Sequence, residues 1–204
     1  MLDQVDLSRH GSCLRKGAIV EPEWRETETD RPRRWGAILA WILLVGLLAV
    51  LGLGLLRSQQ GPISVGSVVP DFVLTTFDGQ EISLRDLSGQ VVVINFWSSW
   101  CLTCDEEAAA LEQSYQLLQD RNVVFLGVNY SDTERAALAY LERYGITYPN
   151  GPDEGTRISQ AFRIKAVPET YIVAPDGRLA FVKIGPFSSV EEIVNAIEGV
   201  RLNP

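Results

Sequence analysis

The most pronounced feature of the hydropathy pattern is an uncharged apolar run that extends from Trp35 to Leu56. A helix over this run is about 33 Å long, enough to cross the hydrocarbon core of a bilayer. Every face of that helix is apolar, as lipid requires. The alternative interpretation of the run is a buried core helix, but such a helix rarely stays uncharged over so many residues. A cleavable signal peptide has a shorter apolar region, of about 7–15 residues. The run therefore predicts an uncleaved transmembrane anchor.

Basic residues predict the orientation of this anchor. Residues 1–34 contain seven of them, and Arg31, Arg33 and Arg34 lie at the start of the run. On its other side, Arg57 is the one basic residue within about twenty positions. The positive-inside rule then places the N-terminus in the cytoplasm and residues 57–204 outside the cell membrane. That compartment permits disulfides.

The parts of the chain around the anchor differ in pattern. Residues 1–34 show neither alternation nor a helical stripe, so we expect a disordered cytoplasmic tail. Cys13 lies in this tail and is expected to be functionally silent, because no apolar run precedes it to form a lipoprotein acylation site. Residues 35–56 form the anchor, residues 57–66 a linker, and residues 67–204 a folded domain.

Within the folded domain, strand and helix patterns alternate. Two alternating segments around Asp78-Gly79 predict a β-hairpin over residues 71–84, because this dipeptide favours a tight turn. Continuous apolar runs predict buried strands at Val91–Trp97 and Val123–Val128. The remaining predicted elements are a hairpin over 170–184 and helices near 102–120, 131–144, 156–161 and 189–199. This order predicts an α/β sandwich with a mixed central sheet.

Composition and charge exclude several classes of function. Hydrophobic residues make up 46% of the chain and charged residues 22%, which indicates a globular rather than a disordered protein. The formal net charge of −8 argues against a nucleic-acid partner, because such proteins need a basic surface to neutralise phosphates. The single histidine, His10, lies in the tail, which excludes most histidine-based catalysis from the domain.

Cys101 and Cys104 lie where a predicted buried strand ends and a helix begins. Their i, i+3 spacing places both sulfurs on one side of the first helical turn, close enough to bond. The free amides and the dipole of the helix N-terminus stabilise a thiolate on Cys101. A zinc site would need three or four ligands, and a purely structural disulfide would close too short a loop to restrict the unfolded chain much. A redox-active pair is the favoured interpretation, with a structural disulfide as the alternative.

The segment Phe96–Cys104, FWSSWCLTC, resembles the thioredoxin active-site signature. Val167–Thr170 is similar to the cis-proline loop that faces that active site. With Asp78-Gly79, Gly127–Tyr130 and the anchor, these motifs resemble the TlpA/ResA/CcmG (DsbE) group of the AhpC/TSA–redoxin superfamily, over residues 61–200. The resemblance implies a thioredoxin-like three-layer sandwich with an N-terminal β-hairpin extension. It also implies a membrane-tethered thiol–disulfide oxidoreductase, and several members of the group serve cytochrome c maturation.

The resemblance also implies roles for residues at the site. Cys101 would attack a partner disulfide, and Cys104 would resolve the mixed disulfide. The residues expected to face the substrate are Trp100, Val167 and Glu169. Pro168 is expected to be cis, because a loop proline near the sulfurs removes a backbone donor and fixes the turn; the alternative is an ordinary turn proline.

Two positions depart from common thioredoxin patterns. Asn95 stands six residues before the first cysteine, where thioredoxins carry a buried aspartate that shuttles protons. Thr103 replaces a proline that is frequent at its position. Glu107 matches a helix glutamate that the ResA-like branch places near its cysteines, so we expect it to handle protons. The alternative for Glu107 is a solvated position on the helix surface.

Charge near the cysteines predicts the direction of electron flow. Asp105, Glu106 and Glu107 follow Cys104 directly, and no basic residue lies between residues 86 and 121. These carboxylates oppose the helix dipole and are expected to raise the thiol pKa. A weakly stabilised thiolate makes a better reductant, so we predict a reductant.

Nothing in the sequence indicates a flavin or nicotinamide site, so no cofactor beyond the Cys101–Cys104 disulfide is expected. A membrane electron donor of the CcdA/DsbD type is implied. The implied substrates are protein disulfides or dithiols, such as those of an apocytochrome c or another thioredoxin-like carrier.

Two other functions compete with this prediction. A peroxiredoxin shares the Val69–Phe72 entry and the hairpin, and Ser98 fits its pattern, but Ile94 replaces the expected proline and the C-x-x-C is atypical. A copper chaperone on the same fold has cysteines separated by three residues and a distal histidine. Neither of those features is present outside the membrane.

Overall fold

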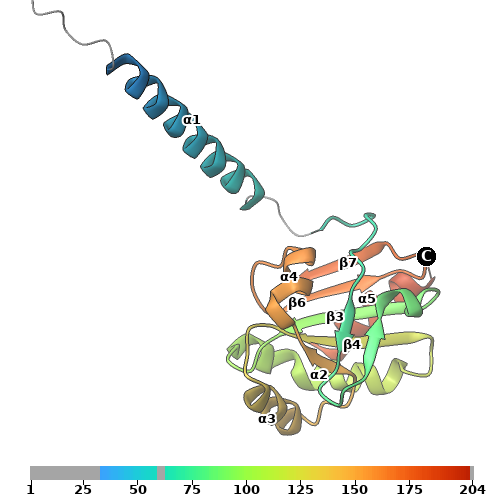
Figure 1. Cartoon of the computed structure of the whole chain (residues 1–204). Coiled ribbons are helices and arrows are strands. Elements are labelled where there is room, and N and C mark those ends of the chain that lie inside the picture. The colour runs from blue at the N-terminus through green and yellow to red at the C-terminus, as the bar shows by residue number, and fades with distance from the viewer. Residues whose placement is uncertain (1–32, 59–62, 203–204) are drawn as a thin grey trace, which may run out of the picture. The chain divides into compact units, whose positions relative to one another are not determined.

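The computed structural model describes residues 33–58 and 63–202, which fall into two units (Figure 1). The first contains most of helix α1, Arg33–Ser58. The stretch Trp35–Leu55 of this helix is long and apolar enough to cross a membrane and is not buried within the protein. The expectations for the tail up to residue 32, including Cys13, and for linker residues 59–62 lie outside the described residues.

The second unit is built on a five-stranded sheet with the order β5-β4-β3-β6-β7. Its strands are β3 (Val91–Trp97), β4 (Val123–Asn129), β5 (Asn150–Pro152), β6 (Glu169–Val173) and β7 (Leu179–Ile184). The β3–β4 and β4–β5 pairs are parallel, whereas β3–β6 and β6–β7 are antiparallel, so the sheet is mixed as predicted. Every residue of the central strand β3 is buried, which accounts for its continuous apolar sequence.

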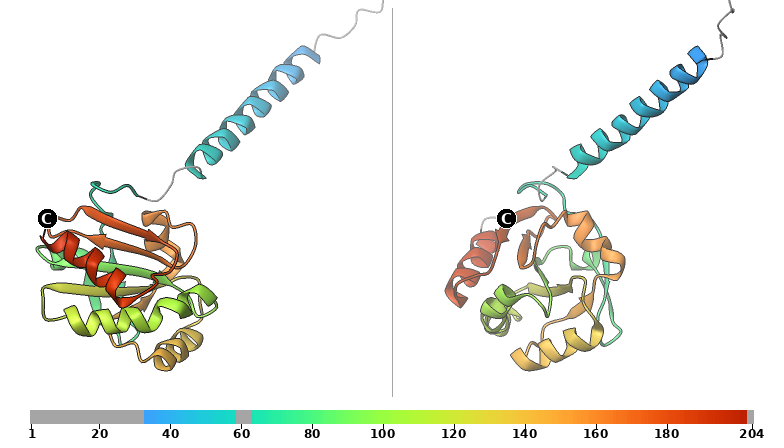
Figure 2. Two further views of the ribbon diagram at one scale, coloured as in Figure 1. Left: turned by 180° about the vertical axis from the view of Figure 1, so that it is seen from behind. Right: turned by 90° about the vertical axis from the view of Figure 1, so that its left-hand side faces the viewer.

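Two layers cover the sheet (Figure 2). On one face, helices α2 (Leu102–Leu118) and α5 (Val190–Leu202) bury residues such as Leu111 and Ile193 against the strands. The opposite face is covered by the hairpin β1 (Val73–Thr75) and β2 (Glu81–Ser83) together with helix α4 (Arg157–Phe162). Helix α3 (Glu134–Tyr144) packs with α2 around Trp97. The predicted thioredoxin-like three-layer sandwich with a hairpin extension is therefore confirmed.

The folded unit begins earlier than predicted. Ile63 packs against the core on the hairpin side, and the Gly66 amide donates to the Leu179 carbonyl oxygen at 2.7 Å. The placement of residues 63–66 in a linker is therefore wrong. Two amides of this segment have backbone acceptors in the folded unit, since Ile63 donates to the Phe162 carbonyl oxygen at the end of α4 and Gly66 donates to Leu179 on β7.

Several local predictions needed adjustment. Helix α3 begins after Thr133, whose hydroxyl accepts from the Ala136 amide, rather than at Ser131. Strand β5 was not predicted, because Asn-Gly-Pro is poor strand sequence and forms only at the sheet edge. Short 3₁₀ helices, Leu84–Leu87 and Glu154–Thr156, complete the domain.

Gly127 on β4 leaves space for the side chain of Asn150, its partner residue on the neighbouring strand β5. A Cβ atom at Gly127 would lie 1.6 Å from Asn150 Oδ1. That oxygen accepts a hydrogen bond of 2.8 Å from the indole Nε1 of Trp97, and Asn150 Nδ2 donates to the Tyr148 carbonyl oxygen. Glycine at position 127 is therefore required for the buried partner of Trp97.

We predict that Gly127→Ala lowers the free energy of unfolding by about 2–3 kcal/mol, because Asn150 is displaced and Trp97 loses its acceptor. Urea denaturation of the full chain in detergent, followed by circular dichroism, measures this. Gly199→Ala, on helix α5, is the control, since apart from the backbone of its own helix the added methyl meets nothing within 4 Å. Equal stability of the two variants would contradict the prediction.

Candidate active site

Cys101 and Cys104 form a disulfide at the junction of β3 and α2. Their Cα atoms are 5.3 Å apart, and Cys101 is the N-cap residue of α2. The Cys104 amide donates to Cys101 Sγ at 3.1 Å, so one free amide of the helix N-terminus is aimed at this sulfur. Cys101 is 6% exposed and Cys104 1%, so Cys101 is the more accessible of the two cysteines.

The cis-proline loop lies against the Cys101 sulfur. The Val167–Pro168 peptide bond is cis, as predicted. Cys101 Sγ lies 3.4 Å from the carbonyl oxygen of Val167, and the Pro168 carbonyl oxygen accepts a hydrogen bond of 2.9 Å from the Gly185 amide. Val167 itself is partly exposed.

Glu169 does not face the substrate side, contrary to expectation. Its side chain is fully buried. One carboxylate oxygen accepts from the backbone amides of Lys165 and Ala166, and the other accepts from the Tyr171 hydroxyl at 2.6 Å. These bonds turn the carboxylate inward, where it fixes the shape of the loop that leads to Pro168. A buried carboxyl group is tolerated here because its oxygens are hydrogen-bonded.

Glu107 lies inside the protein, 1% exposed, so it does not occupy a solvated helix surface. Its two oxygens accept hydrogen bonds of 2.8 Å, one from Asn95 Nδ2 and the other from the Phe187 amide. Asn95 Nδ2 also donates to Thr170 Oγ1 at 2.9 Å, which links α2 to β3 and β6. Burial raises the pKa of Glu107 to about 7, although both hydrogen bonds oppose this shift.

Other carboxylates near the cysteines lie closer to solvent. Asp105 is partly exposed and Glu106 is exposed, and both belong to the first turns of α2. Asp105 Oδ1 is nevertheless buried without a hydrogen-bond partner among the described residues.

The structure adds Asp132 to the site, a residue that the sequence analysis did not identify, and shows the surroundings of Trp100, which it did identify. Asp132, on the loop after β4, accepts hydrogen bonds from both the amide and the hydroxyl of Ser99. Trp100 is 59% exposed, and its indole Nε1 donates to the Ser131 carbonyl oxygen at 3.1 Å. A signal for Asp132 existed, because the carboxyl ends of the parallel strands β3 and β4 meet at one edge of the sheet.

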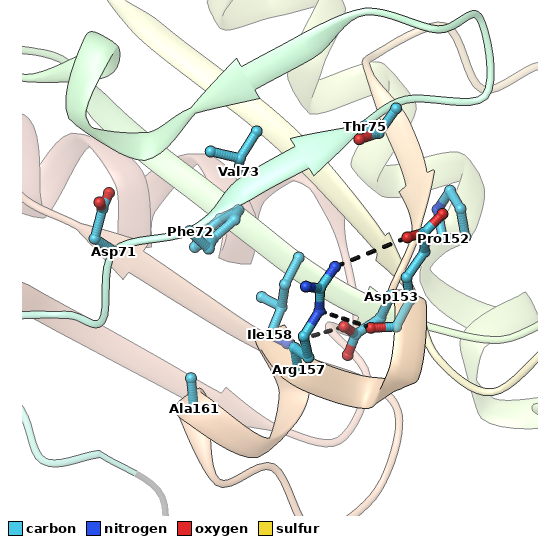
Figure 3. A pocket seen from close by; sticks show the side chains of 10 residues that line it. Asp71, Phe72, Val73, Thr75, Pro152, Asp153, Arg157, Ile158 and Ala161 are labelled. Carbon is cyan, nitrogen blue, oxygen red and sulfur yellow. Dashed lines mark hydrogen bonds and ion pairs between the residues drawn. The ribbon is translucent and has the colours of Figure 1, made fainter.

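A hollow of about 280 Å³ lies away from the cysteines, between the hairpin and α4 (Figure 3). Its polar groups are used within the chain. Both oxygens of Asp153 accept from backbone amides at the start of α4, and Arg157 forms an ion pair of 3.8 Å with Glu154. We therefore assign no role to this hollow. Within the described ranges, no cluster of three or more His, Cys, Asp or Glu residues has the geometry to hold a metal ion.

Comparison with known proteins agrees with this geometry. The model of the AhpC/TSA family matches residues 65–182, more than half of the chain. The chain belongs to the AhpC/TSA family. It is 30% identical to the thiol–disulfide oxidoreductase ResA of Bacillus subtilis over 162 residues, 77% of this chain and 90% of that protein. ResA of Geobacillus thermodenitrificans is 28% identical over 80% of this chain and 95% of its own length.

A solved structure shows the same thioredoxin-like fold. A thiol:disulfide interchange protein of the thioredoxin family from Chlorobium tepidum superposes with a TM-score of 0.61 at 22% identity, covering 70% of this chain and 98% of that one. Together with the ResA relatives and the disulfide at the helix N-terminus, the family makes this AhpC/TSA protein a thiol–disulfide oxidoreductase of the TlpA/ResA/CcmG group.

The raised pKa of Glu107 predicts a pH dependence of stability. The unfolded chain releases the Glu107 proton near pH 4.5, whereas the folded chain holds it to about pH 7. Folding is therefore favoured by this group below pH 4.5, and the contribution, of up to about 3 kcal/mol, is lost as the pH rises to 7. Urea denaturation of the oxidised protein between pH 4.5 and pH 8 measures the slope.

Glu107→Gln is expected to remove this part of the slope, because glutamine does not titrate. Glu106→Gln, one position away on the exposed side, is the matched control and should keep it. If Glu107→Gln and the parent chain lose stability in parallel over this range, Glu107 titrates as an ordinary carboxylate and the prediction is wrong.

Proposed function

We propose that this protein is a membrane-tethered, extracytoplasmic reductant of protein disulfides. The observation that carries the proposal is the position of Cys101, the more exposed of the two cysteines, at the N-terminus of α2, where two carboxyl-bearing residues, Asp105 and Glu106, directly follow Cys104. The helix amides stabilise a Cys101 thiolate, and the carboxylates oppose it, so the dithiol form is not strongly favoured. A dithiol of this kind donates its electrons to a partner disulfide.

The reaction balances without a bound cofactor. The Cys101 thiolate attacks one sulfur of the partner disulfide, and the other partner sulfur leaves as a thiolate that takes up a proton. Cys104 then loses its proton and attacks Cys101 Sγ, which forms the Cys101–Cys104 disulfide and releases the second partner thiol. Two electrons pass to the partner. Glu107, buried on the same helix with its pKa near 7, is the proposed acceptor of the Cys104 proton.

Location and partners complete the proposal. The basic residues before α1 favour a cytoplasmic N-terminus and an extracytoplasmic catalytic domain. Re-reduction of the disulfide then requires an electron donor within the membrane, of the CcdA/DsbD type. The ResA and CcmG resemblance favours cytochrome c maturation, with an apocytochrome c or another thioredoxin-like carrier as substrate.

We predict that Cys104→Ser traps partner proteins as mixed disulfides on Cys101, since the resolving thiol is missing. Cys101→Ser should trap none, because Cys104 is buried. Each variant carries Cys13→Ser, so the tail contributes no thiol. Partners are recovered from cells by non-reducing purification and identified by mass spectrometry.

Two results would contradict the proposal. One is trapping by Cys101→Ser at the level of Cys104→Ser, which would make Cys104 the attacking residue. The other is catalytic consumption of peroxide by Cys104→Ser with no trapped protein, which would indicate a thiol peroxidase.

A further inference from the structure

The segment that precedes Cys101 is clamped by the loop after β4. Each residue from Trp97 to Trp100 is hydrogen-bonded to one of Tyr130, Ser131 or Asp132. The Trp97 carbonyl oxygen accepts from the Tyr130 amide at 2.8 Å, the Ser98 hydroxyl donates to the Tyr130 carbonyl oxygen, and Ser99 and Trp100 donate to Asp132 and Ser131. The two loops meet because β3 and β4 are parallel neighbours that end together.

Asp132 is the central acceptor of this clamp. Its Oδ2 accepts from the Ser99 amide at 2.6 Å and from Asn129 Nδ2 at 3.2 Å. Its Oδ1 accepts from the Ser99 hydroxyl at 2.9 Å and from the Thr133 amide at 2.8 Å. Partial burial raises the pKa of Asp132, but these hydrogen bonds outweigh it and leave the pKa below its usual value. Asp132 is therefore ionised, and its bonds are charge-assisted.

The clamp determines where Trp100 lies. Its large side chain is mostly exposed, so packing alone does not fix it, and its indole Nε1 donates a hydrogen bond to the Ser131 carbonyl oxygen. Ser131 presents that carbonyl from a left-handed backbone conformation, with φ of +47°. Residues other than glycine adopt this conformation at a cost, so neighbouring contacts must hold it. The contacts of Asp132 with Ser99 and Thr133 lie directly beside Ser131.

We propose that Asp132 is a positioning residue for the reaction with protein disulfides, acting through Ser99 and Ser131 on the orientation of Trp100 beside Cys101. Asp132 does not touch either sulfur in this role and transfers no proton. It preorganises the exposed Trp100 side chain, which an incoming protein contacts next to the attacking sulfur. Preorganisation of this kind raises the rate with a large substrate and leaves a small one nearly unaffected.

A purely architectural role predicts a different result. Asp132 is only partly buried, and α3 keeps its own cap at Thr133. Loss of Asp132 should therefore leave the domain folded. Glu134, exposed at the first position of α3, offers a matched change of the same charge outside the clamp.

The test uses the full chain in detergent, reduced, with Cys13→Ser in every variant. The second-order rate constant is measured with insulin as the protein disulfide and with 5,5′-dithiobis(2-nitrobenzoate) as the small one. For Asp132→Ala we expect the insulin rate to fall about tenfold and the small-disulfide rate less than about twofold. Asp132→Asn, which keeps one acceptor oxygen, should fall between the parent and Asp132→Ala. Glu134→Gln should match the parent.

A second comparison tests the route through Trp100. Trp100→Phe removes the indole donor. In the Trp100→Phe background, Asp132→Ala should therefore slow insulin reduction by less than about a further twofold. Thermal unfolding is measured for each variant, and Asp132→Asn replaces Asp132→Ala throughout if the latter does not fold. Equal slowing of both disulfides, an equal effect of Glu134→Gln, an unchanged insulin rate, or full additivity with Trp100→Phe would each overturn the proposal.

Discussion

The hydrogen bond from the Cys104 amide to Cys101 Sγ is the contact on which the chemistry of this protein depends. It exists because α2 begins shortly after β3 ends, with Cys101 as its N-cap residue. Strand β3 occupies the centre of the sheet and is buried along its whole length, so the core holds the end of this strand in place. The two sulfurs directly follow this end and are therefore held in place by the core. A reactive group needs such support to be positioned accurately.

Carboxylates on α2 differ in role because their surroundings differ. Glu107 faces the sheet and lies in a network with Asn95 and the Phe187 amide, where burial favours its protonated form. Asp105 and Glu106 lie closer to solvent near the helix N-terminus. In the proposed function, Glu107 accepts the Cys104 proton, and the carboxyl groups of Asp105 and Glu106 oppose a thiolate on Cys101.

The sequence was sufficient for features that depend on local pattern. The buried strands β3 and β4, the helix after the C-x-x-C pair and the cis state of Pro168 follow from apolar runs, spacing and resemblance, and the structure contains all of them. The inward direction of Glu169 was not predictable, because two of its partners are backbone amides of a loop whose path the sequence does not specify. Asp132 was missed because its partner Ser99 is 33 residues away and the two meet only through parallel pairing.

The reduction potential of the Cys101–Cys104 pair tests the central claim most directly. The full chain with Cys13→Ser is equilibrated in detergent with dithiol redox buffers of known potential, and the oxidised fraction is determined by alkylation and mass spectrometry. The account predicts a potential near or below about −250 mV, in the range of thioredoxin. A potential near about −120 mV, in the range of strong disulfide oxidants, would contradict it.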